Sequence, residues 1–388
     1  MLTNGYSAEY GRSAGGVISA VTRSGSNQWH GSAFEFVRNS AFDAKNFFDP
    51  ANQKVPHFAR NQFGGLASGP IVKDRTFFLA SYEGLRQRLG VTNQAVVPNA
   101  AARNGELPGL AKIAVNPAVP AYLNLVPLPN GRDFGDGTGQ YLSSASNLDD
   151  EDFVAGRIDH RFSDKTSLFG RYTFNNAAVQ VPDNLQLFTS GTASRNQYAT
   201  AQLTRVFNDH LLNNVRFSYN RSTNRTTPEA LHTIDPALSF FPGRPLGQIT
   251  ITGLFSIGPS RFGPSFNELN LYQLGDDLSW IVGRHSLKFG FDQRNIDLPT
   301  SRPQSPNGFY QFTSLANFLR AAPASVELAL PSSEVERRWR QAMTAAYVQD
   351  DFHLVRRLTV NAGLRYERTS VPIEAHNREA NVRNPLTD

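Results

Sequence analysis

The sequence predicts an all-β fold, in which an antiparallel sheet forms part of a transmembrane β-barrel. Two observations lead to this prediction. Segments of about ten residues alternate between apolar and polar side chains, as strands with one apolar face do. The connections between these segments alternate strictly between tight turns and long loops, as in barrels whose short turns are periplasmic and whose long loops face outward.

The hairpin at 152–175 shows this pattern most clearly. In its first arm, Val154 and Ile158 fall on one face and Arg157 falls on the other. A tight turn follows, and the second arm, 167–175, alternates in the same way. A soluble sandwich could also contain such a hairpin, so the prediction of a barrel depends on its repetition along the chain.

The same criterion predicts further strands along the chain, in the order 29–38, 61–72, 76–86, 195–207, 211–221, 269–282, 286–297, 337–352 and 358–367. With the hairpin, this gives about eleven strands. A short β-branched segment at 17–22 precedes them. Long loops are predicted at 39–60, 88–151, 177–194, 222–268 and 298–336, the last with a short helix at 314–320.

Composition narrows the class of protein. The chain has 38 Lys+Arg and 33 Asp+Glu, and the net charge of +5 is too small to indicate a nucleic-acid partner. It has no Cys, which excludes disulfides and Cys-based metal sites. No apolar run is long enough for a membrane-spanning helix. The first residues lack the basic and apolar regions of a signal peptide, so we expect this chain to be a piece of a longer one.

No motif indicates an enzyme or a bound cofactor, and we expect neither. Gly11, Gly15 and Gly16 are not followed by Gly-Lys-Ser/Thr, so a backbone bend is favoured over a phosphate-binding loop. The His residues lack metal-ligand spacing, and no Ser/His/Asp set indicates a hydrolase. Acidic residues at 133–139 and 149–152 could offer oxygen ligands to calcium, but their spacing favours a solvated loop.

Several segments together resemble TonB-dependent outer-membrane receptors, in particular their large Oar-like subgroup. Residues 7–25, followed by 29–36, are similar to the junction between plug and barrel in that family, with Tyr10, Gly11, Gly15, Gly16 and Val17 at the junction. Further similarity lies at 61–66, 69–70 and 76–84, and in a later hairpin at 347–352 and 358–367. The resemblance covers most of the chain and depends on the order and spacing of these segments.

The resemblance implies a barrel of about 22 strands that an N-terminal plug occludes. It assigns residues 1–26 to the end of the plug and 27–388 to the first part of the barrel. The implied activity is uptake of a bulky substrate across the outer membrane, with energy from the TonB complex acting through an N-terminal region that this chain lacks. The partners are therefore outer-membrane lipid, the TonB complex and a substrate that could be a carbohydrate, a peptide or a metal chelate.

Five arginines fall on the polar faces of the predicted strands, namely Arg157, Arg161, Arg171, Arg216 and Arg365. As lumen-facing residues they could meet an anionic ligand or plug carboxylates. A lumen lined with ordinary hydrated charge is the simpler interpretation, since barrel interiors are polar. Aromatic residues near strand ends, Phe36, Tyr82, Phe174 and Tyr219, are typical of an interfacial girdle.

Ligand contacts are expected from the loops at 88–151, 222–268 and 298–336, because long outer loops meet an incoming molecule first. Two alternatives stay open. The same barrel could serve a non-transporting surface protein with a role in adhesion or matrix export. The chain could also be a soluble β-sandwich, whose apolar faces would turn inward.

Overall fold

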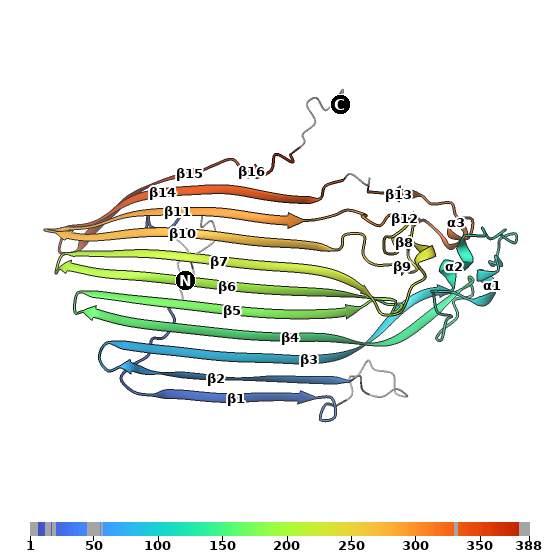
Figure 1. The fold of residues 1–388 in the computed structure, drawn as a ribbon, viewed down its shortest axis with the longest axis horizontal. Helices are drawn as coiled ribbons and strands as arrows, with labels where there is room; N and C mark the ends of the chain where they lie inside the picture. The colour runs from blue at the N-terminus through green and yellow to red at the C-terminus, as the bar shows by residue number, and fades with distance from the viewer. Residues whose placement is uncertain are drawn as a thin grey trace, which may run out of the picture.

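A computed structural model describes residues 7–11, 17, 21–44, 55, 57–329 and 333–379. Its main element is a 12-stranded sheet in which every neighbouring pair is antiparallel (Figure 1). The strands, in order across the sheet, are β1 (His30–Asn39), β2 (Phe58–Val72), β3 (Thr76–Pro98), β4 (Thr138–Ser163), β5 (Thr166–Pro182), β6 (Phe188–Asn208), β7 (Leu211–Ala230), β10 (Ser265–Val282), β11 (His285–Ser301), β14 (Glu336–Val355) and β15 (Leu358–Thr369), and β16 (Ile373–Glu374) pairs with β14.

The predicted order of strands and tight turns is confirmed. The long loop predicted at 177–194 is wrong, because Ala177–Pro182 pairs with Thr189–Ser194 and leaves a connection of five residues, 183–187. All the tight turns lie at one end of the sheet, and the long connections lie at the other (Figure 1). The sheet does not close on itself, because β1 and β15 form its two edges within the described residues. The fold is thus an open segment of a transmembrane antiparallel β-barrel.

The strands are longer than the sequence predicted. β4 has 26 residues, whereas crossing a bilayer at a tilt requires about 9–11. The prediction of a continuous loop at 88–151 is wrong at both ends, because Gly90–Pro98 pairs with Thr138–Ser146. These stretches lie beyond the part of the strand that crosses the hydrocarbon, where apolar alternation is no longer required and the sequence signal disappears.

Three of the four aromatic residues expected in an interfacial girdle, Tyr82, Phe174 and Tyr219, lie on one face of the sheet, and Phe36 lies on the other. Phe36 pairs with Gln62, whose amide donates a hydrogen bond to Glu83 at 2.5 Å. Glu83 and its neighbour Tyr82 point to opposite faces, because side chains alternate along a strand. Phe36 therefore shares a face with Gln62, away from Tyr82.

The long connections fold into a compact unit, which we call the cap, at the end of the sheet that carries the loops (Figure 1). Its elements are α1 (Ala100–Arg103), α2 (Val119–Leu123), the 3-10 helix η1 (Pro236–Leu238), β8 (Gln248–Ile251), β9 (Ser256–Ile257), β12 (Phe309–Phe312), α3 (Leu315–Leu319) and β13 (Ser325–Glu327). The four short strands form a second sheet in the order β13-β12-β8-β9. Among the described residues, no helix is long and apolar enough to cross a membrane.

The main hydrophobic core of the described chain lies in the cap. Its most deeply buried side chains include Ile251, Ile257, Phe318 and Leu319, and the end of β3 adds Val97 to it. The predicted helix at 314–320 is confirmed as α3, which Ser314 caps by accepting a hydrogen bond from the Asn317 N–H at 3.2 Å. The apolar face of α3 is thereby held against β12, where Phe318 packs on Phe312.

Candidate functional site

Described residues of the N-terminal segment lie against one face of the large sheet. Arg365 of β15 donates hydrogen bonds to the carbonyl oxygens of Ala8 and Glu9 at 3.4 and 3.1 Å. Arg157 of β4 donates to the hydroxyl of Thr22 at 2.8 Å. Residues of one segment thus contact both halves of the sheet, on the face that we call the inner face.

The opposite face, which we call the outer face, is apolar and open. Nine of its large side chains are between 40 % and 71 % exposed, namely Val154, Ile158, Tyr172, Leu203, Phe217, Tyr272, Leu274, Leu364 and Tyr366. A patch of this extent would be unfavourable in water. It is the surface that a membrane barrel presents to lipid, with polar side chains on the inner face of the same strands.

The strand register places all five sequence-predicted arginines on the inner face. Arg157 is the register partner of Arg171, and Arg161 follows on the same face of β4. Arg216 and Arg365 reach this face on β7 and β15. The structure does not gather the five into one cluster, since they are spread from β4 to β15.

Two of these arginines, Arg157 and Arg365, connect the N-terminal segment to the inner face of the sheet. Besides Thr22, Arg157 bonds Asp159 at 2.6 and 2.8 Å and lies 4.4 Å above the ring of Phe169. Arg365 bonds Glu367 at 2.7 Å in addition to its two carbonyl contacts. Their side chains are only 13 % and 14 % exposed, so both guanidinium groups are enclosed and paired.

The junction residues of the sequence prediction are described in part. Tyr10 closes a turn by donating its N–H to the Ser7 carbonyl at 3.0 Å. A side chain at Gly11 would collide with Arg365 and Glu367, so glycine permits this close approach. Val17 forms an isolated bridge, and Gly15 and Gly16 lie outside the described residues, as do residues 18–20 of the predicted strand at 17–22.

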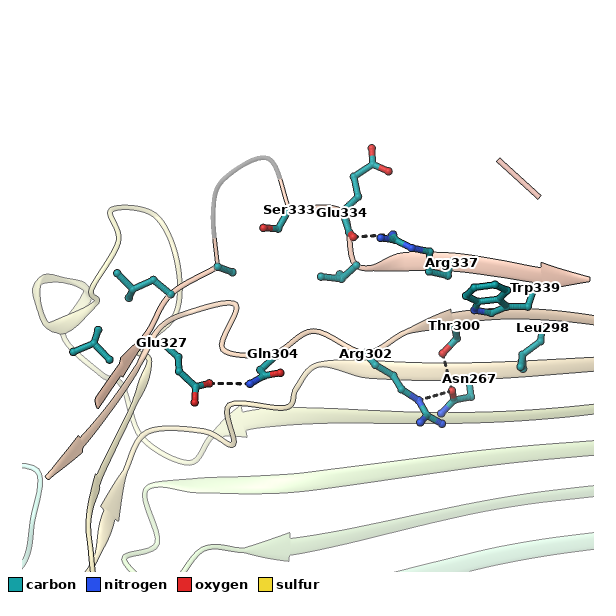
Figure 2. A pocket seen from close by; sticks show the side chains of 14 residues that line it. Asn267, Leu298, Thr300, Arg302, Gln304, Glu327, Ser333, Glu334, Arg337 and Trp339 are labelled. Atoms are coloured by element: carbon teal, nitrogen blue, oxygen red, sulfur yellow. Dashed lines mark hydrogen bonds between the residues drawn. The ribbon is translucent and has the colours of Figure 1, made fainter. Parts of the chain in front are cut away.

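A cavity of about 930 Å³ opens between the chain around β13 and the loop-bearing ends of β10, β11 and β14 (Figure 2). We call it the mouth cavity. The strand residues that line it, Asn267, Leu298, Thr300, Arg337 and Trp339, all have inner-face register. The cavity therefore lies on the same face as the N-terminal segment, at the end of the sheet that carries the cap. Its volume falls within the range of pockets that bind organic ligands.

The polar groups of the mouth cavity are held by one another. Asn267 accepts hydrogen bonds from Arg302 at 3.1 Å and from Thr300 at 2.7 Å (Figure 2). Arg337 is fixed by the backbone carbonyls of Glu334 and Glu336 at 2.8 and 2.9 Å. Two guanidinium groups are thereby positioned at the cavity, where they can form bidentate contacts with carboxylate or phosphate groups.

Glu327 supplies negative charge to the mouth cavity. Its carboxylate accepts hydrogen bonds from Gln304 at 3.1 Å, Ser305 at 3.0 Å and Arg261 at 2.5 Å. The bond from Gln304, with those from Ser305 and Arg261, outweighs the loss of solvent and holds the pKa of Glu327 below its usual value. The cavity thus presents an ionised carboxylate together with two guanidinium groups.

An indole completes the mouth cavity. Trp339 and Leu298 form one wall (Figure 2), and Val326, Leu328 and Val335 also line the space. An aromatic ring beside fixed donors and acceptors suits a large polar ligand such as a sugar or a peptide. The expected ligand loop at 298–336 does line the cavity. The middle of this loop, with most of the loops at 88–151 and 222–268, builds the cap.

Sequence reasoning did not single out the residues of this cavity. Asn267 lies on β10, Trp339 on β14 and Arg302 in the connection after β11, so no spacing along the chain relates them. The sequence signal for them is the alternation of side chains along a strand, because Arg337 and Trp339 lie on the inner face of the same strand, β14.

At the calcium candidate of the sequence analysis, Asp133 and Asp136 accept hydrogen bonds from backbone N–H groups of their own loop. Among the described residues, no group of three potential ligands is placed to hold a metal ion.

Two known outer-membrane transporters are similar to this chain in sequence or in fold. The chain is 23 % identical over 429 residues to the TonB-dependent transporter Oar of Myxococcus xanthus, covering 95 % of this chain and 39 % of that protein. Its fold is similar to that of the outer membrane transporter YddB from Escherichia coli, with a TM-score of 0.57 and 14 % identity over 95 % of this chain and 43 % of the other. The chain thus spans about two fifths of the length of each.

The model of a protein family described as the outer membrane beta barrel domain matches residues 21–387. The match includes every strand of the large sheet and the whole cap. With an apolar outer face and a polar inner face, the chain belongs to the outer membrane β-barrel domain family and is a protein of the outer membrane.

Proposed function

We propose that this chain is part of a TonB-dependent transporter that imports a bulky substrate across the outer membrane. The observation that supports this most is the position of the mouth cavity. It lies at the loop-bearing end of the sheet and on its inner face, where a molecule arriving from outside would enter the lumen. The N-terminal segment lies on the same face, in the path that such a molecule would follow.

The domain assignment belongs to the same proposal. Residues 1–26 form the end of a plug, and residues 27–388 form the first part of a barrel of the Oar-like kind. The open edges β1 and β15 support it, because unpaired strand edges are costly in lipid and further strands would satisfy them. Energy would come from the TonB complex through a region outside this chain.

The inner-face arginines have two roles in this proposal. Arg157 and Arg365 hold the plug segment against the inner face of the sheet by donating hydrogen bonds to carbonyl and hydroxyl oxygens of that segment. Arg161, Arg171 and Arg216 line the lumen as hydrated charge. The proposed ligand contacts are those of the mouth cavity, where Trp339 provides stacking area and Arg302 and Glu327 provide charge.

The test is an uptake assay on cells that produce the full-length protein. Labelled oligosaccharides, peptides and ferric chelates are supplied to cells with and without functional TonB. We expect one class to accumulate only when both the protein and TonB are present. Accumulation without TonB, or of no class, would contradict the proposal. Binding without accumulation would instead identify a non-transporting surface protein.

The purified protein then localises the binding step. Replacing Trp339→Ala should weaken binding of the accumulated ligand by a factor of about 10 to 100, as expected for a central aromatic contact. The matched control is Trp280→Ala, which removes an indole from the outer face of β10 and should leave affinity unchanged. Equal effects of the two variants would exclude the mouth cavity as the binding site.

A further inference from the structure

The outer face carries an apolar groove of about 570 Å³ that crosses neighbouring strands from β3 to β7. Its floor consists of small residues, of which Ala80 pairs with Gly156 and Gly170 pairs with Ala201. Its walls include the rings of Tyr172 and other aromatic side chains. The lipid-facing surface is therefore hollowed here.

Neither the backbone conformation nor a close neighbour requires glycine at the two glycine positions of the floor. Gly156 and Gly170 do not have positive φ angles, so the backbone does not need glycine at either position. A Cβ added to either would meet nothing within 4 Å, so no close neighbour requires glycine. Glycine weakens the interior of a strand, and its effect at these two positions is to keep the groove open.

The groove lies in the periplasmic half of the membrane. Ala80 is five residues from Arg75, Gly170 is five from Lys165, and Ala201 is four from Arg205. These three cations mark the end of the sheet that carries the tight turns. At about 3.3 Å per residue along tilted strands, the floor lies about 10 to 13 Å inside that edge. Half of the hydrocarbon core is about 15 Å thick.

Positive charge borders the groove at the turns. Arg75, Lys165 and Arg205 are exposed, and Lys73 lies in the same turn as Arg75. The turns adjoin each other, because the Arg161 N–H donates to the Arg75 carbonyl and the Val206 N–H to the Lys165 carbonyl, both at 2.8 Å.

Acidic groups in the same turns offset only part of this charge. They are Asp74, which accepts a hydrogen bond from Asn27 at 2.5 Å, Asp164, and Asp209 in the turn after β6. The four cations outnumber them, so the rim attracts an anionic group.

We propose that the groove and this rim form a binding site for one phospholipid of the periplasmic leaflet. One acyl chain lies over Gly156 and Gly170, and the phosphate is bound by Arg75, Lys165 and Arg205. The apolar floor at the depth of an acyl chain and the cations at the depth of a headgroup together select this ligand. Lipopolysaccharide belongs to the other leaflet, at the end of the sheet that carries the cap.

The test uses the full-length protein in mild detergent and native mass spectrometry with added dioleoyl phosphatidylglycerol. Ala201→Leu fills the floor of the groove. The matched control, Ala362→Leu, adds the same side chain to the outer face of β15, outside the groove. We expect Ala201→Leu to weaken lipid binding about tenfold or more, because displacing two methylene groups has an effect of that size. We expect no change with Ala362→Leu.

A second pair of measurements tests the headgroup contact without altering the groove. The double variant Lys165→Glu and Arg205→Glu changes only exposed side chains at the rim. It should weaken phosphatidylglycerol binding at least as much as Ala201→Leu, and binding of zwitterionic phosphatidylcholine much less. Equal losses for both lipids, equal effects of the two leucine variants, or a co-purifying protein in place of lipid would each overturn the proposal.

Discussion

The cap and the large sheet place the same kinds of residue in opposite ways. Leu319 of the cap is fully buried, whereas Leu364 of the sheet is 71 % exposed. The cap has a packed interior and meets water, so its apolar side chains turn inward. The sheet meets hydrocarbon, so its apolar side chains turn outward and the inner face is polar. The solvent around each region therefore determines what its alternation pattern means.

The largest expected effect comes from the interior of the cap. Phe318 is 2 % exposed. Its ring contacts those of Phe312 and Phe255 edge to face, with 5.2 and 6.3 Å between ring centroids. We expect Phe318→Ala to destabilise the cap by about 3–5 kcal/mol, the usual loss for a buried ring. Hydrogen exchange of the full-length protein in nanodiscs would show faster exchange at 246–257 and 309–321, with the transmembrane strands still protected.

A phenylalanine of the sheet provides the matched control. Phe217 is 50 % exposed on the outer face, so Phe217→Ala creates no cavity inside the protein. Its effect on exchange should be clearly smaller than that of Phe318→Ala. If both variants changed exchange equally, the distinction between a packed cap and a lipid-facing sheet would be wrong.

A charged substitution tests the solvent of each region directly. Leu203 on the outer face and Leu110 in the cap are 40 % and 54 % exposed. Leu203→Arg should cost about 2–4 kcal/mol, because it places a charge in hydrocarbon. Leu110→Arg should change stability by less than about 0.5 kcal/mol, because the site already faces water. Urea unfolding from lipid vesicles measures both, and a tolerated arginine at 203 would contradict the lipid-facing assignment.

The same contrast explains how far sequence reasoning could go. Strand order, turns and faces of the sheet were predictable, because one solvent boundary imposes a period of two on many consecutive residues. The cap was not predictable beyond α3. β8 and β9 have only four and two residues, and β8 pairs in parallel with β12, which lies far along the chain. Contacts between distant loops leave no local pattern.

The mouth cavity was predictable only as a region. The loop at 298–336 was expected to meet ligand because of its length, and it lines the cavity. The pairing of Arg302 with Asn267 could not be inferred, because it depends on the register between β10 and β11. The face of Phe36 was missed for a related reason, since one strand's alternation does not say which of its faces is the inner one.

A partly buried arginine of the cap should matter more than an exposed, paired arginine of the sheet. Arg103 donates to the carbonyls of Pro98, Leu123, Val126 and Pro127 at 2.6–3.2 Å, and burial lowers the pKa of its guanidinium. Arg103→Met should destabilise the cap by about 1.5–3 kcal/mol, because charged donors are lost to enclosed carbonyls. Hydrogen exchange at 98–127 measures this effect.

The control for this prediction is an ion pair of the sheet. Arg88 bonds Asp150 at 2.6 Å, with side chains 39 % and 40 % exposed. An exposed pair of this kind contributes about 0–1 kcal/mol, so Arg88→Met should have a small effect. A larger loss from Arg88→Met than from Arg103→Met would reverse the comparison.

The smallest expected effect is a local response to acid after β15. The Glu374 carboxylate accepts backbone N–H bonds from Arg338 at 2.9 Å and from His376 and Arg378 at 2.8 Å. Loss of solvent opposes ionisation, but these donors outweigh it, and the pKa of Glu374 falls to about 2. Because the folded pKa lies below the ordinary value of 4.5, the carboxylate stabilises this segment above that pH. The stabilisation is then lost as the pH falls towards 2.

The absence of cysteine allows one spin label to report on this segment. Val371→Cys places the label at a side chain that is 79 % exposed. Its mobility should increase as the pH falls from about 4.5 to about 2, the range between the ordinary and the lowered pKa. With Glu374→Gln the mobility should be raised already at pH 7 and no longer change with acid, because the charged acceptor is absent throughout. A pH response that persists in Glu374→Gln would assign it to another group.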